Sequence, residues 1–238
     1  MDINKCCPEK VVSAEMAIAK IKRGSRVFVG TGCGEPQHLI HAMAVDKGIR
    51  DIMIYQMLSH TLVPYLDDPS FGSRFLLKLF FISESMRKAA YEGKIDYLPT
   101  YLSQIPKLFE NYHISLDVAL IQVSPPDRFG LASLGVSVDI TMAAAQSADL
   151  VIAQINSNMP RVLGRSFIHV NEVDCFVEHD EPLLTIGENP ELAAANDIGR
   201  LIAQRLVDDG ATIAIGMGTT EQGNIKTHIP KLKMHTLR

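Results

Sequence analysis

The sequence predicts an α/β fold, an open and mainly parallel sheet flanked by helices. Short apolar runs rich in β-branched residues alternate with stretches of helical spacing, which is typical of βα units. Residues 26–29 run into a glycine-rich turn and then a helical stretch, 38–45, an arrangement that clusters backbone N–H groups at the start of a helix. Residues 117–123 and 149–155 are apolar strands on either side of an alanine-rich segment, 141–147.

The remaining elements of this first unit follow in chain order. A helix is expected over 13–22, with Ser13 as its N-cap and Gly24 as its stop. Further strands are expected over 52–58, 75–82, 165–169 and 175–177. Helical segments are expected over 85–92 and 101–109, the second as a short helix or turn, and 64–72 is expected to be loop.

A second unit is expected to begin near residue 187. Asn189-Pro190 breaks the chain before a long helix over 190–207. A strand over 212–215 then runs into a second glycine loop, 216–220, which echoes the first and suits a protein built from two similar α/β halves. We therefore divide the chain into an N-terminal α/β domain, 1–186, and the incomplete start of a second domain, 187–238.

Composition indicates a globular cytoplasmic protein. A net charge of -4 argues against a nucleic-acid partner, whose recognition needs a basic face. The apolar runs are too short to span a membrane, and the N-terminus lacks the apolar core of a signal peptide. No metal is expected, because His38 and His41 have no third ligand and the acidic run 178–181 reads as a solvated edge. No disulfide or metal spacing relates the four cysteines, Cys6, Cys7, Cys33 and Cys175.

Polar side chains follow the strands 117–123 and 149–155. Ser124-Pro125-Pro126-Asp127 ends the first of them, because proline cannot donate to a ladder, and 156–161 follows the second. Ligands of open α/β sheets bind at the carboxyl ends of the strands, so this edge is the predicted site. The turn after 26–29 has Glu35 where a dinucleotide-binding loop needs its third glycine, which argues against a nicotinamide cofactor; a tight turn closing a βα unit is the alternative.

Three motifs resemble the N-terminal half of the acetyl-CoA hydrolase/transferase family, which includes 4-hydroxybutyrate CoA-transferase and butyryl-CoA:acetate CoA-transferase. They are S-P-P-D-x-x-G-x-x-S-L-G-x-S-V-D from Ser124, I-A-Q-x-N-x-x-M-P-R-x-x-G from Ile152 and R-K-A-x-x-E-G-K-x-D-Y-x-P from Arg87. The resemblance implies a CoA-transferase-like fold, of the NagB/RpiA-like type.

The resemblance also implies a reaction, the exchange of CoA between short-chain carboxylic acids. In the family a glutamate attacks an acyl-CoA thioester, and a glutamyl-CoA thioester forms while backbone N–H groups hold the oxyanion. Acyl-CoA and a short-chain carboxylate are the expected partners, with CoA as substrate and no cofactor. The implied acyl pocket includes Gly32, Gln122, Ser124 and Asn156, with turn hydrogen bonding as the alternative for the last two. The implied CoA loop is Gly216, Met217, Gly218, Thr219 and Thr220.

The chain departs from the family pattern from about Ala214 onward. His235-Thr236 match the family, but Leu237 occupies the position of the catalytic glutamate, and Thr220-Glu221 replace an Ile-Pro pair. We therefore expect a truncated form that is inactive alone, with no catalytic residue; Glu35, Glu84 and Glu221 are the other carboxylates considered as nucleophiles. The uncovered apolar surface predicts a homo-oligomer, or a missing C-terminal half that would bind there.

Three other functions stay open at this point. The chain is a non-catalytic binding or interaction module with the same fold, an acyl-CoA hydrolase, or, on fold analogy alone, a sugar-phosphate-binding α/β domain.

Overall fold

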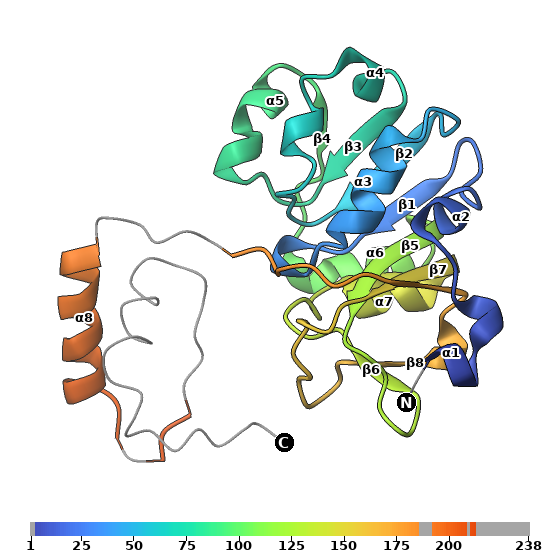
Figure 1. The fold of residues 1–238 in the computed structure, drawn as a ribbon. Coiled ribbons are helices and arrows are strands. Elements are labelled where there is room, and N and C mark those ends of the chain that lie inside the picture. The colour runs from blue at the N-terminus through green and yellow to red at the C-terminus, as the bar shows by residue number, and fades with distance from the viewer. Residues whose placement is uncertain (1–2, 186–191, 209, 213–238) are drawn as a thin grey trace. The chain divides into compact units, whose positions relative to one another are not determined.

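A parallel sheet of seven strands, in the order β4-β3-β2-β1-β5-β7-β9, runs through the first part of the chain (Figure 1). The computed structural model describes residues 3–185, 192–208 and 210–212. The chain divides into two units, Met1–Thr185 and Ile186–Arg238. The mainly parallel α/β architecture that the sequence predicts is therefore confirmed.

The bounds of the elements are as follows. The strands of the large sheet are β1 (Arg26–Val29), β2 (Ile52–Gln56), β3 (Phe75–Leu79), β4 (Ile95–Tyr97), β5 (Leu116–Val123), β7 (Ala148–Ile155) and β9 (Cys175–Glu178). An antiparallel pair is formed by β6 (Leu131–Ser133) and β8 (Phe167–His169). The helices are α1 (Ile3–Cys6), α2 (Ala14–Ile18), α3 (Gln37–Val45), α4 (Pro69–Gly72), α5 (Arg87–Tyr91), α6 (Ile105–Glu110), α7 (Thr141–Ser147) and α8 (Leu192–Arg205).

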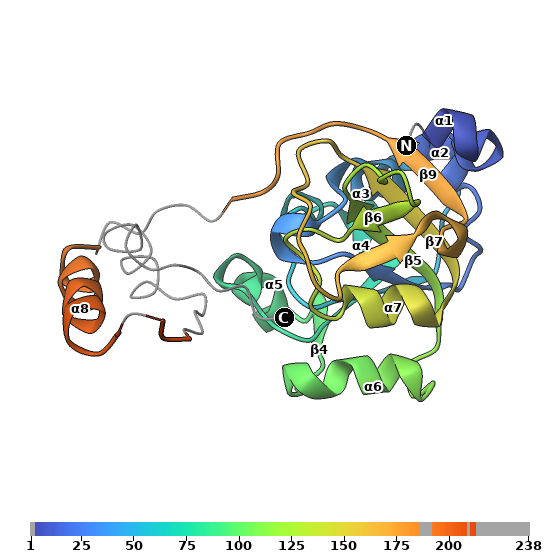
Figure 2. The same ribbon diagram turned by 90° about the horizontal axis from the view of Figure 1, so that it is seen from below.

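Two hydrophobic cores lie on the two faces of the sheet, because side chains alternate along each strand. Along β5, Val118 and Leu120 face the core that contains α2, α3 and α5. Ala119 and Ile121 face the other core, which contains α6 and α7. Figure 2 shows α6 and α7 together on one side of the sheet. Helices on both faces explain why the central strands are almost wholly apolar.

The strand order reverses between β1 and β5. From β1 the chain builds outward through β2, β3 and β4, and it then returns to place β5 on the other side of β1. Connections leave these two neighbouring strands in opposite directions, and in open α/β sheets the ligand-binding crevice lies at the carboxyl ends of two such strands. The glycine-rich loop that follows β1 and the Ser-Pro-Pro-Asp segment that follows β5 both start at this crevice.

Several boundaries differ from the sequence prediction for local reasons. Ser13 is the N-cap of α2, accepting from the backbone N–H of Met16 at 3.3 Å, but the helix ends at Ile18, well before Gly24. The loop predicted over 64–72 is wrong in part, because Asp68 caps a short helix, α4. The strands β4 and β6 were not expected, since three residues are too few to show a periodicity.

Of the second unit the structure describes α8 and the few residues after it. This helix confirms a helical segment within the predicted 190–207. The predicted strand over 212–215, the loop Gly216–Thr220, Glu221 and Leu237 fall at or beyond the limit of the described residues. In the part of the chain that the structure describes, every helix is too short or too polar to cross a bilayer.

Candidate functional site

Buried polar side chains gather at the carboxyl ends of β1, β2, β5 and β7. All of them are at most 7% exposed, and they are Thr31, Glu35, Gln56, Ser59, Gln122, Ser124, Ser133, Ser137, Gln154 and Asn156. Burying so many polar groups is costly unless they are hydrogen-bonded, so the edge is held together by a specific network of hydrogen bonds. This network surrounds the crevice at the strand-order reversal.

The glycine loop after β1 forms the centre of the edge. Gly30 donates its backbone N–H to the carbonyl of Leu120 on β5 at 2.8 Å, and Gly32 donates to the carbonyl of Leu58 at 3.0 Å. Gly32 has φ +57, a conformation that favours glycine, and no heavy atom lies within 4 Å of the position that its Cβ would occupy. One face of this loop is therefore open for a ligand to approach.

The S-V-D part of the first motif holds the glycine loop. Ser137 donates its hydroxyl to the carbonyl of Thr31 at 2.6 Å, and Thr31 donates its own hydroxyl to the carboxylate of Asp139. Asp139 also accepts the backbone N–H of Thr141, the first residue of α7, at 3.0 Å. Gly34 packs so closely that a Cβ there would lie 2.3 Å from the Cβ of Ser137. Sequence reasoning did not assign this role to the motif.

Glu35 lies at the end of the loop and is fully buried. Its carboxylate accepts the backbone N–H groups of His60 at 2.5 Å and Thr61 at 2.8 Å, and its carbonyl accepts the amide of Gln122 at 2.9 Å. Burial raises the pKa of Glu35 to about 7, although the hydrogen bonds from Thr61 and His60 act in the opposite direction. Because each oxygen already accepts a backbone N–H, this carboxyl fixes the loop after β2.

Two of the predicted pocket residues lie directly against each other. Asn156 donates its amide to the side-chain oxygen of Gln122 at 2.7 Å and to the carbonyl of Glu181 at 2.8 Å. Ser124 accepts the backbone N–H of Ser133 at 3.0 Å and donates to the carbonyl of Pro125 at 3.2 Å. The polar atoms of these side chains thus bond within the protein, and their contact with a substrate stays a prediction.

Other polar atoms at this edge have no partner. Within the described residues, buried side-chain atoms without a hydrogen bond are Oε1 of Gln56, Oε1 of Gln154, Nε2 of His60 and Oγ1 of Thr61. Buried acceptors and donors of this kind are satisfied by water or by a ligand. His60 and Thr61 belong to no sequence motif, so sequence reasoning missed them; only their position after β2 pointed to this edge.

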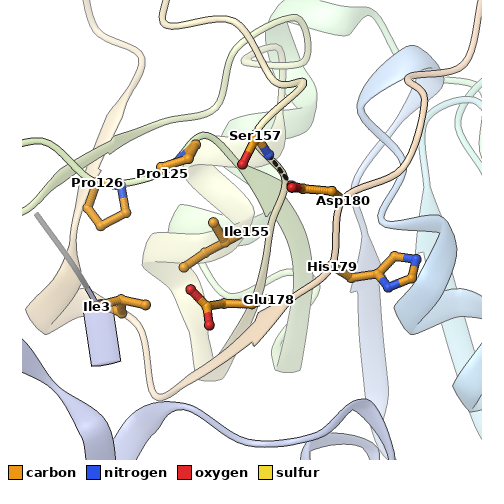
Figure 3. Close-up of a pocket in the computed structure, with 8 residues that line it drawn as sticks. All are labelled: Ile3, Pro125, Pro126, Ile155, Ser157, Glu178, His179 and Asp180. Atoms are coloured by element: carbon orange, nitrogen blue, oxygen red, sulfur yellow. Dashed lines mark hydrogen bonds between the residues drawn. The ribbon is translucent and has the colours of Figure 1, made fainter. Parts of the chain in front are cut away.

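A cavity of about 390 Å³ lies farther along the same edge, at the ends of β5, β7 and β9 (Figure 3). Asp180 accepts the backbone N–H of Ser157 at 2.6 Å, and this hydrogen bond lowers the pKa of the Asp180 carboxyl. With Glu178 beside it, the rim carries two carboxylates, which disfavour an anionic ligand. The glycine loop between β1 and β5, which leaves one face open at Gly32, is the other candidate for a site that binds a carboxylate or a phosphate.

An ion pair joins the two longest motifs. Arg161 contacts the Asp127 carboxylate at 2.6 Å and donates to the carbonyl of Leu131 at 2.9 Å. Pro125 and Ser157, which follow β5 and β7, line the same cavity. The two motifs thus meet on one side of the molecule.

The acidic run 178–181 is not a solvated edge throughout. The Glu181 side chain is only 15% exposed and accepts the amide of Gln154 at 2.6 Å. It also accepts the backbone N–H of His38, in the first turn of α3, at 3.3 Å, and the rings of His38 and His179 stack with their centroids 3.8 Å apart. Burial lowers the pKa of His38. Among the described residues no group of three or more His, Cys, Asp and Glu side chains could hold a metal ion.

Known proteins are similar in sequence to this chain along most of its length. It is 39% identical over 222 residues to the 4-hydroxybutyrate coenzyme A transferase of Clostridium kluyveri, covering 92% of this chain and 51% of the relative. It is 34% identical to the succinyl-CoA:acetate/propanoyl-CoA:succinate CoA transferase of Fasciola hepatica, covering 96% of this chain and 48% of the relative. The chain therefore spans about half the length of these relatives.

Solved structures give the same result for the fold. RipA from Yersinia pestis superposes with a TM-score of 0.82 and 30% identity, over 94% of this chain and 54% of that one. A 4-hydroxybutyrate CoA-transferase from Porphyromonas gingivalis superposes with a TM-score of 0.70 and 26% identity, over 95% and 54%. The sequence profile of the acetyl-CoA hydrolase/transferase N-terminal domain matches residues 1–187. With this profile match and the three sequence motifs, the chain belongs to the acetyl-CoA hydrolase/transferase family.

Proposed function

We propose that this chain supplies the acyl-acid side of a CoA-transferase site for short-chain carboxylic acids. The observation that carries the proposal is the glycine loop at the β1–β5 crevice, which is hydrogen-bonded to Ser137 and Asp139 through Thr31 while Gly32 stays open. The backbone N–H groups of Gly30 and Gly32 already donate within the protein, so the support for a ligand here is the open face at Gly32, where a carboxylate or a thioester oxygen can approach the backbone. Three of the curated relatives are named as CoA transferases of 4-hydroxybutyrate, succinate, propanoate or butyrate, which supports short-chain acids as the substrate class.

We propose that the described residues position the acyl acid, and that the covalent chemistry of the family belongs to residues outside them. The resemblance places the CoA loop at Gly216–Thr220 and the glutamate position at Leu237, an aliphatic side chain that cannot be acylated. Glu35 is no substitute, because both its oxygens accept backbone N–H groups. We therefore expect this chain to bind acyl-CoA or the free acid weakly and to transfer nothing by itself.

Complementation tests this function. The chain is co-expressed with the C-terminal half of the Clostridium kluyveri relative, and butyryl-CoA formation from acetyl-CoA and butyrate is followed by chromatography. Transfer by the pair, with none by either half alone, is the expected result. The two halves of the relative, expressed separately, are the matched control. Activity of that control pair without activity of the mixed pair would contradict the proposal, and turnover by this chain alone would refute the loss of its nucleophile.

A further inference from the structure

Two adjacent thiols lie at the end of helix α1. The Sγ atoms of Cys6 and Cys7 are 3.1 Å apart, and Cys6 is exposed while Cys7 is half-buried. A disulfide bond is about 2.05 Å long, so a shift of roughly 1 Å brings the two sulfurs to bonding distance. Neither thiol has a place in the function proposed above.

These thiols are tied to the cavity at the ends of β5, β7 and β9. Cys7 donates its backbone N–H to the carbonyl of Ile3 at 2.9 Å, which closes the single turn of α1. Ile3 is 3% exposed and lines the cavity together with Ile155 and Glu178 (Figure 3). Asn4 also donates to the Glu178 carboxylate at 2.8 Å. The backbone at Cys6-Cys7 therefore fixes one wall of the cavity.

We propose that Cys6 and Cys7 form a redox-responsive pair, which a low-molecular-weight disulfide such as glutathione disulfide oxidises to a vicinal disulfide that opens α1 and withdraws Ile3 from the cavity wall. This site is separate from the glycine loop and does not depend on the transferase function.

The reaction balances without any further reagent. The Cys6 thiolate attacks the small disulfide, a mixed disulfide forms and one small thiol leaves; the Cys7 thiolate then attacks the Cys6 sulfur and releases the second small thiol. Two protein thiols lose two electrons and two protons, and the reagent gains them. The hydrogen bond to Cys7 raises the pKa of the Cys6 thiol, which lowers its thiolate fraction at neutral pH, so the first attack is faster in alkaline solution.

Ring closure strains the helical turn. The ring of a disulfide between neighbouring cysteines contains the Cys6–Cys7 peptide bond, and the N–H of this peptide closes the turn of α1 on the carbonyl of Ile3. Cys7 already has φ -143 and ψ 55, outside the helical region. Adjacent Cα atoms are also about 3.8 Å apart, closer than the usual 4.4–6.8 Å of disulfides, which makes the bond strained and readily reduced.

Peptide mapping tests the pair directly in the full chain. Trypsin cuts after Lys5 and Lys10 and releases one peptide that holds both thiols and neither Cys33 nor Cys175. After treatment with glutathione disulfide this peptide should lose two hydrogen atoms, resist iodoacetamide and recover with dithiothreitol. The C7S variant should stop at a mixed disulfide on Cys6, while the C33S control should behave like the wild type.

Hydrogen exchange tests the structural consequence. A peptic fragment over residues 3–12 should exchange faster after oxidation of the wild type, and C7S carrying the mixed disulfide should not show this increase. Persistent mixed disulfides or cross-linked dimers in the wild type would overturn the pairing. A vicinal disulfide that leaves the exchange unchanged would overturn the coupling to α1. Each result stands independently of any transfer activity.

Discussion

Ser137 and Thr31, 106 residues apart in the chain, are joined by a 2.6 Å hydrogen bond from the serine hydroxyl to the threonine carbonyl. The bond links the loop after β1 to the segment that starts α7, and it brings together two motifs that are distant in the sequence. The shape of the glycine loop therefore depends on a residue outside it. The contact between Gly34 and Ser137 makes this dependence measurable.

A double-mutant cycle on Gly34 and Ser137 tests the packing. G34A should destabilise the protein by about 1–3 kcal/mol, because the new Cβ lies 2.3 Å from the Cβ of Ser137. S137G removes that atom, and the Cα left behind is an ordinary contact at 3.5 Å. In urea unfolding the double variant should be less destabilised than the sum of the two single variants. Additive effects would contradict the close approach.

Glu35 should make stability depend on pH in the direction opposite to most carboxyl groups. Its pKa rises from 4.5 to about 7 on folding, so between these values the folded state binds the proton more tightly than the unfolded state. Stability contributed by the protonated group is therefore lost as the pH rises from 4.5 through 7, a loss of about 3 kcal/mol. Urea unfolding at a series of pH values measures the slope.

The E35Q variant should flatten this slope, because its side chain does not titrate. It should also be less stable than the wild type at low pH, since an amide presents one acceptor to two backbone N–H donors. E110Q removes an exposed carboxylate from α6 and is the matched control. A wild-type slope that survives in E35Q would show that another group causes it.

The fold was predictable because its signals are local. The alanine-rich segment of α7 and the long apolar runs of β5 and β7 indicate their own structure, and α7 begins and ends where the sequence places it. Short elements such as β4 and α4 were missed, since three or four residues do not define a period. The antiparallel pairing of β6 with β8 depends on partners far apart in sequence.

The gathering of polar residues at one edge of the sheet was predictable, and their contacts were less so. Polar residues that follow neighbouring parallel strands lie together, because the carboxyl ends of these strands meet at one edge. The sequence gives no indication that Gln122 and Asn156 bond to each other, or that Glu35 reaches the backbone of His60 and Thr61. Such partners become visible only when the tertiary structure places the segments side by side.

Arg161 should stabilise the contact between the motifs that follow β5 and β7 through its forked guanidinium group. It contacts Asp127 and the carbonyl of Leu131 at the same time, and it lies 4.4 Å over the ring of Phe167. R161A and R161K should both lower the melting temperature, with lysine close to alanine because one ammonium cannot replace the fork. Retention of the wild-type melting temperature by R161K would show that charge alone is sufficient.

Alanine substitutions at two glycines distinguish a role of the glycine loop in ligand binding from the loss of stability at a positive φ. Gly32 and Gly24 both have positive φ, and neither has a heavy atom within 4 Å of its Cβ position. G32A and G24A should therefore lose a similar stability, about 1 kcal/mol each. Only G32A, at the crevice, should weaken the binding of acetyl-CoA or butyrate by calorimetry. Equal weakening by G24A, at the opposite edge of the sheet, would contradict the assignment.

The most direct measurement of the proposed site is an NMR titration of the ¹⁵N-labelled chain with butyrate. If the crevice between β1 and β5 holds the acyl acid, the backbone amides of the glycine loop, Gly30–Glu35, and of His60 and Thr61 should shift together with one saturation curve. Shifts confined to the opposite edge, around Gly24, or a spectrum unchanged at saturating butyrate would contradict the account.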